Sequence, residues 1–101
     1  MVIEWLKIPV PTDRQNDFLH NDRAIWTDTL SKQPGFAGKE CWRDPDSPEI
    51  LNLVIHWNTL ADWKAVPDSV LAAADQAFCD AMGQSFPVAL CTRYDVMSAP
   101  A

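Results

Sequence analysis

His56 is the side chain best suited to acid–base chemistry in this sequence. It follows the apolar run ILNLVI and precedes Trp57. An imidazole titrates near neutral pH, so His56 could act as a general base on a phenol or an activated C–H group. Asn52 shares its face, because alternate residues of a strand point the same way. The structural alternative is a histidine at the rim of the fold, bonded to water or a carboxylate.

Two further charged residues lie inside apolar strands, Glu4 in VIEWLKI and Arg93 in VALCTRYDV. A buried carboxylate is costly unless it is paired or protonated, so Glu4 could pair with His56 or Arg93. Arg93 could bind a substrate carboxylate or phenolate. We expect Glu4 to share the face of His56 if the two strands run parallel; Trp5 and Lys7 are the alternative inward set. Salt bridges that set the strand register or the dimer contact would explain both charges without catalysis.

The five tryptophans are many for 101 residues. Trp26 and Trp57 fit a buried core. A flat aromatic wall would suit a planar ring ligand, and packing between subunits would explain the same residues equally well. The candidate pocket residues are Trp5, Trp42, Asn52, Trp63 and Tyr94.

The sequence contains no pattern for a metal or a nucleotide. The three cysteines form no CxxC pair, the two histidines lie far apart in the sequence, and no GxGxxG, GxSxG or HExxH motif occurs. We therefore expect no cofactor and no metal. Unpaired thiols and the absence of a leader-like segment predict a cytoplasmic protein.

Length and charge restrict the remaining classes. A chain of 101 residues predicts one domain over residues 1–101. The net charge is −6 with scattered Lys and Arg, so we expect neither nucleic-acid binding nor attachment to an anionic membrane. No apolar stretch approaches the ~20 residues that span a bilayer.

Periodicity and turn residues predict the elements. Strands are expected at residues 2–8, 36–43, 50–57 and 88–96, and helices at 13–31, 59–66 and 69–82. Thr12 and Gln15 match a capping box, Asn58 or Thr59 can cap the short helix, and Gly83 is expected to end the last helix. In residues 36–43, alternation groups Phe36 with Glu40 and Trp42.

The strand at 50–57 is apolar on both faces, and such a strand must be covered on both sides. The order β-α-β-β-α-β predicts an α+β, ferredoxin-like antiparallel sheet with two helices on one face. A second copy would cover the other face. The prediction is a homodimer through the sheet face, a dimeric α+β barrel with room for a small apolar or aromatic ligand.

The chain resembles the antibiotic biosynthesis monooxygenase domains in this order of elements and in three segments. These are the strand ending in Trp57, the turn and helix WNTLADWKA, and the strand VALCTRYDV. The segments EWLKI, AIWTDTL, PGFAGKECW, VIHW and ADWKAVP resemble an uncharacterised cyanobacterial group within them. The resemblance covers residues 2–96. It implies a dimeric α+β barrel. One function that it implies is that of a cofactor-independent monooxygenase acting on a small aromatic or quinol-type substrate.

The resemblance also separates the branches of that superfamily. Haem-degrading members use an Asn in the first strand and a His in the second helix; here the first strand has no Asn and no His follows His56. The cofactor-free oxygenases use Trp, Asn, Tyr and Arg groups, which match Trp57, Asn58, Trp63, Arg93 and Tyr94 by type and region.

Three functions stay open. In an oxygenase, His56 or Glu4 takes a proton and Arg93 or Asn52 stabilises the oxyanion. A non-catalytic protein would only bind a small ligand. A purely structural dimer would fill its interior with its own tryptophans.

Overall fold

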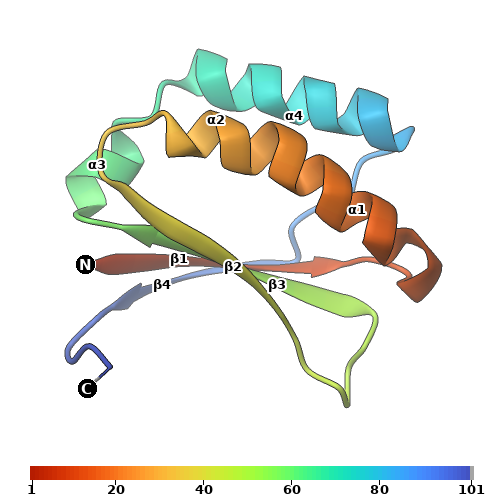
Figure 1. The fold of residues 1–101 in the computed structure, drawn as a ribbon, viewed down its shortest axis with the longest axis horizontal. Coiled ribbons are helices and arrows are strands. Elements are labelled where there is room, and N and C mark those ends of the chain that lie inside the picture. The colour runs from red at the N-terminus through yellow and green to blue at the C-terminus, as the bar shows by residue number, and fades with distance from the viewer. Residues whose placement is uncertain (101) are drawn as a thin grey trace.

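The computed structural model describes residues 1–100 and shows helices packed on one face of an antiparallel sheet (Figure 1). The strands are β1 (Val2–Pro9), β2 (Phe36–Arg43), β3 (Ile50–Trp57) and β4 (Leu90–Asp95), in the sheet order β2-β3-β1-β4. The predicted ferredoxin-like α+β fold is confirmed. The suggested parallel pairing of the first and third strands is wrong, because β1 and β3 run antiparallel.

The first helical stretch spans the predicted residues but is not one regular helix. It comprises η1 (Thr12–Arg14), α1 (Gln15–Asn21), the π-helical η2 (Asp22–Thr27) and α2 (Asp28–Ser31). A π segment widens the helix and often occurs at a functional site. This segment begins at Asp22, which is buried although the apolar spacing of the helix does not place it toward the sheet.

The predicted capping box at the start of this stretch is wrong. Pro11 is the N-cap of η1, and no side chain caps it. Gln15 is buried instead, and its amide donates hydrogen bonds to the carbonyl oxygens of Val10 at 3.0 Å and Pro48 at 2.6 Å. Gln15 therefore joins the start of the helix to the loop before β3.

The other two predicted caps are confirmed. Thr59 precedes α3 (Leu60–Lys64), and its hydroxyl accepts a hydrogen bond from the backbone N–H of Asp62 at 3.0 Å. Gly83 ends α4 (Asp68–Met82) with φ +75°, a left-handed conformation that glycine adopts readily. Within residues 1–100, no helix is both long and apolar enough to cross a membrane.

The predicted faces of β3 are confirmed. Leu51, Leu53, Ile55 and Trp57 belong to the two buried clusters beneath the helices. Trp57 is the largest fully buried side chain and is 1% exposed. Asn52 and His56 point to the opposite face of the sheet, as alternation requires.

The faces of β2 differ from simple alternation. A bulge interrupts the pairing with β3 between Phe36 and Gly38, and Gly38 has φ +135°. The extra residue moves Phe36 to the helix side, where its ring lies 5.9 Å from that of Trp57. Glu40 and Trp42 stay on the outer face, so the predicted grouping of Phe36 with them is wrong.

Candidate functional site

A cavity of about 540 Å³ lies between the sheet and the helices. Leu6, Ile55 and Trp57 form its floor, while Trp26 and Phe78 cover it from the helices. The volume is in the range of small-molecule sites, and the lining is mostly apolar. Such a space can hold a flat ring compound and exclude most water from it.

Glu4 is the carboxylate on the floor of this cavity. It lies opposite Ile55 in the β1–β3 register and therefore faces the helices. The expectation that Glu4 shares the face of His56 is thus wrong, because it assumed parallel strands. Trp5 and Lys7, the alternative set, are the residues that share that outer face.

Burial raises the pKa of Glu4 above its ordinary value of 4.5. The indole N–H of Trp57 donates a hydrogen bond to Glu4 Oε1 at 3.1 Å, and this bond acts in the opposite direction. The positive charges of Lys64 and Lys39 also lower the pKa, by smaller amounts. A half-buried carboxyl with a raised pKa and a fixed orientation can take and return a proton.

Two lysines, Lys39 and Lys64, belong to the cavity lining. Trp63 and Lys64 line it from α3, and Lys64 Nζ lies 4.4 Å from the centre of the Trp63 ring. Lys39 lines another part of the wall from β2, where its Nζ donates to Asp22 Oδ2 at 2.7 Å. Burial raises the pKa of Asp22, while the charge and hydrogen bond of Lys39 lower it.

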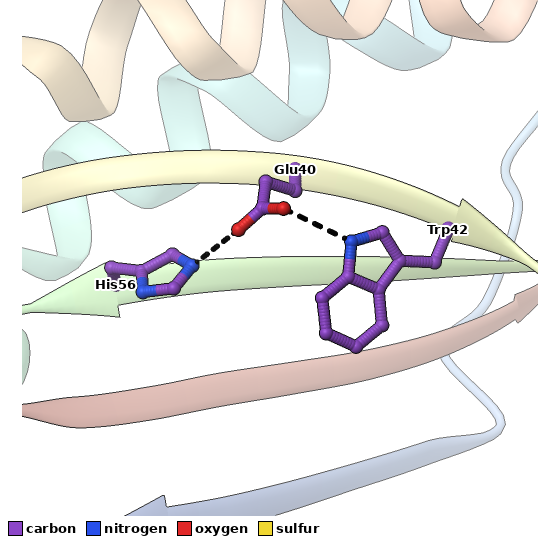
Figure 2. A network of polar contacts seen from close by, with 3 residues as sticks. All are labelled: Glu40, Trp42 and His56. Carbon is purple, nitrogen blue, oxygen red and sulfur yellow. Dashed lines mark hydrogen bonds and ion pairs between the residues drawn. The ribbon is translucent and has the colours of Figure 1, made fainter. Parts of the chain in front are cut away.

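His56 lies on the outer face of the sheet, away from this cavity (Figure 2). Its Nε2 is 2.8 Å from Glu40 Oε1, and the indole of Trp42 donates to Glu40 Oε2 at 3.2 Å. The hydrogen bond from His56, and then that from Trp42, hold the pKa of Glu40 below its ordinary value. The geometry is that of the predicted structural alternative, a rim histidine bonded to a carboxylate.

Most of the predicted pocket residues share that outer face. Trp5 donates from its indole to Asn52 Oδ1 at 3.0 Å, and its ring lies 5.0 Å from Trp42 and 5.5 Å from Tyr94, edge to face. Only Trp63 of the predicted set lines the cavity. The structure thus divides one predicted site into two places on opposite sides of the sheet.

Arg93 lies directly opposite Glu4 in the β1–β4 register. It is on the cavity side of the edge strand but is exposed, and within residues 1–100 it forms no ion pair. Arg93 is not among the residues that line the cavity.

Sequence reasoning missed Lys39, Asp22 and Lys64 as site residues. Alternation in β2 places Lys39 on the helix side, so an inward charge was a usable signal. No such signal exists for Asp22 in the sequence, because an acidic residue on a helix that carries several others is expected to face solvent.

The donor set does not fit a haem ligated by histidine. Neither His20 nor His56 lines the cavity. Among the described residues, no group of three or more His, Cys, Asp or Glu side chains could hold a metal ion.

No family model matches this chain, and no curated protein matches its sequence. Solved structures match it over nearly its whole length. A candidate antibiotic biosynthesis monooxygenase of Bordetella bronchiseptica superposes with a TM-score of 0.73, at 20% identity, covering 96% of this chain and 97% of that one. This chain has the fold of the antibiotic biosynthesis monooxygenases.

Two other matches have different activities. SnoaB, a cofactor-independent oxygenase of Streptomyces nogalater, matches with a TM-score of 0.64 at 13% identity, covering 97% of this chain and 94% of that one. The heme-degrader MhuD of Mycobacterium tuberculosis matches with a TM-score of 0.66 at 20% identity over 100% of both chains. At these identities the likeness establishes the fold alone, because one fold carries several activities.

Proposed function

We propose that the helix-side cavity binds a small aromatic or quinol-type molecule and that the protein acts on it as a cofactor-independent monooxygenase. The observation that carries this proposal is Glu4, a half-buried carboxyl on the floor of an apolar, tryptophan-lined cavity. Glu4, rather than His56, is the base in this proposal, because His56 faces away from the cavity.

The chemistry needs only the substrate, O₂ and a base. Glu4 takes a proton from an activated C–H group, and the ring stabilises the resulting carbanion. The carbanion adds to O₂ with formation of a C–O bond, and the proton returns to give a hydroperoxide. Loss of water leaves a ketone, so one O₂ oxidises one CH₂ group to C=O plus H₂O without an external reductant. A dry cavity favours this route, because water would compete for the carbanion.

Arg93 and Lys64 would bind the oxygen that gains negative charge. Arg93 is opposite Glu4 on the neighbouring strand, and Lys64 lines the cavity beside Trp63. Preorganised positive charge near a developing oxyanion lowers the barrier to its formation.

We also propose that the outer face pairs with a second copy of the chain. This face exposes aromatic side chains to solvent, including Trp42 at 43% and Tyr94 at 50% exposure, and an exposed apolar patch of this kind often marks a protein–protein contact. In such a homodimer, His56 and Glu40 would lie at or near the contact. The cytoplasmic location and the place within a cyanobacterial group stay predictions.

Oxygen uptake tests the activity. An anthrone or a naphthalenediol is mixed with protein in air-saturated buffer, and consumption is compared with heat-inactivated protein. We expect protein-dependent uptake that Glu4→Gln abolishes and that His56→Ala retains, with the oxidised ring identified by mass spectrometry. Uptake that survives Glu4→Gln would remove Glu4 from the mechanism.

A non-catalytic binding protein is the second candidate, since the same cavity would serve it. Calorimetric binding of a naphthol without oxygen uptake for any ring compound tried would favour it. Absence of both binding and uptake would leave the purely structural dimer.

A further inference from the structure

Lys39 is a lysine whose side chain is almost completely buried at the cavity wall. The side chain is 5% exposed, while its partner Asp22 is 8% exposed. Burying an ion pair seldom stabilises a fold relative to apolar residues of the same shape, since both charges lose their hydration. Such a pair beside a cavity is therefore a candidate functional site.

The Lys39 ammonium has more hydrogen-bond donors than acceptors around it. It carries three N–H donors, and among residues 1–100 its only hydrogen bond is to Asp22 Oδ2. The pair is incomplete on the acid side as well, since Asp22 Oδ1 is buried without a partner. Buried polar atoms are rarely left unpaired in the absence of a ligand or water. Asp22 also begins the π-helical segment, which moves the helix locally out of its regular path.

The register places Lys39 and Glu4 on either side of one residue. Both pair with Ile55, Lys39 from β2 and Glu4 from β1, so all three side chains face the helices. Two strand spacings separate the Cα atoms of Lys39 and Glu4 by about 10 Å. The floor of the cavity thus has an apolar centre, an acid on one side and an ammonium on the other.

We propose that Lys39 donates a hydrogen bond from Nζ into the cavity, to a carbonyl or phenolate oxygen of a ligand whose ring lies over Ile55 and whose other end meets Glu4. This inference rests on the proposed function and specifies its ligand. The ligand is a ring compound with a proton donor at one end and an oxygen acceptor at the other. Asp22 neutralises the lysine, so a neutral carbonyl is favoured over a full anion.

Calorimetric binding of two matched probes tests this role. One is a naphthol with an acetyl group on the far ring, and the other is the same naphthol with an ethyl group. They are similar in size and differ in the oxygen acceptor. We expect the wild-type protein to bind the acetyl probe about tenfold or more tightly, as for a hydrogen bond from a charged donor.

The variant Lys39→Met alone leaves Asp22 buried without its counter-ion and could fail to fold. The double variant Asp22→Asn with Lys39→Met removes both charges at similar volume. Its matched control is Asp28→Asn with Lys32→Met, which removes the surface ion pair of α2 at 3.1 Å. We expect the first double variant to lose the acetyl preference with ethyl affinity unchanged, and the control to keep the preference.

The outcomes separate the two proposals. If the wild-type protein binds both probes equally, the Lys39 role is overturned and the ligand cavity stands. A preference that persists in the Asp22/Lys39 variant overturns the Lys39 role in the same way. If the wild-type protein binds neither probe, the cavity proposal fails and the Lys39 role fails with it.

Discussion

Replacing Trp57 by Phe tests the contact that holds Glu4 on the cavity floor. Trp57 is buried, and its indole N–H is bonded to Glu4 Oε1 at 3.1 Å. Phenylalanine fills most of the ring space but cannot donate. The carboxylate then loses its partner while still largely removed from water.

The expected cost has two parts. Losing a hydrogen bond to a charged group costs about 1.5–3 kcal/mol. The smaller ring leaves a partial void, which adds about 1 kcal/mol, below the cost of full truncation to alanine. The sum is about 3 kcal/mol, a large fraction of the 5–15 kcal/mol by which domains of this size are typically stable. It corresponds to a fall in Tm of roughly 12–24 °C.

Urea unfolding followed by far-UV circular dichroism at neutral pH measures this cost without depending on tryptophan fluorescence. Glu4→Met and the double variant complete a cycle with Trp57→Phe. We expect a coupling free energy of about 1.5 kcal/mol or more between the two positions, because either replacement alone already removes the hydrogen bond between Trp57 and Glu4.

The matched control is Trp26→Phe. Trp26 lines the same cavity, and among residues 1–100 its indole N–H has no hydrogen-bond partner. It should lose only its packing, at about 1 kcal/mol. A coupling near zero between Trp57 and Glu4, or equal costs for the two tryptophan variants, would refute the reasoning.

Three further predictions concern other parts of the molecule. Glu4→Gln should raise the urea midpoint at neutral pH: the folded-state pKa of Glu4 is raised, so its contribution to stability is full below the unfolded value of 4.5 and is lost as pH rises through the folded value. This gain in the urea midpoint should vanish in titrations below the unfolded value of 4.5. A gain that persists there would contradict the raised folded-state pKa of Glu4. His56→Ala should leave calorimetric naphthol binding unchanged while lowering the dimer fraction in native mass spectrometry; altered binding would place His56 at the ligand site. Gly38→Val should destabilise the fold by about 1–3 kcal/mol in urea, because φ is +135° there although a Cβ would meet no atom within 4 Å; an unchanged midpoint would show that the bulge relaxes freely.

The candidate site was only partly predictable. Alternation in β3 correctly placed Trp57 toward the helices and His56 away from them, since that pattern is local. The side of Glu4 was left open between two alternatives, and the one that assumed parallel strands is wrong, because the side depends on which strand pairs with β1 and in which direction. The β2 bulge at Gly38 likewise changed the face of Phe36, and a single sequence carries no reliable sign of one extra residue in a ladder.

The sequence by itself determined the element order, the antiparallel α+β class, the caps at Thr59 and Gly83, and which residues of β3 share a face. These features follow from local periodicity and from the conformations that single residues allow. Only the tertiary structure decided that Glu4 and Lys39 flank Ile55, and that Asp22 meets Lys39 across the boundary between helix and sheet. Those contacts depend on strand register and on the path of a π-helical turn, which long-range packing sets and local sequence does not record.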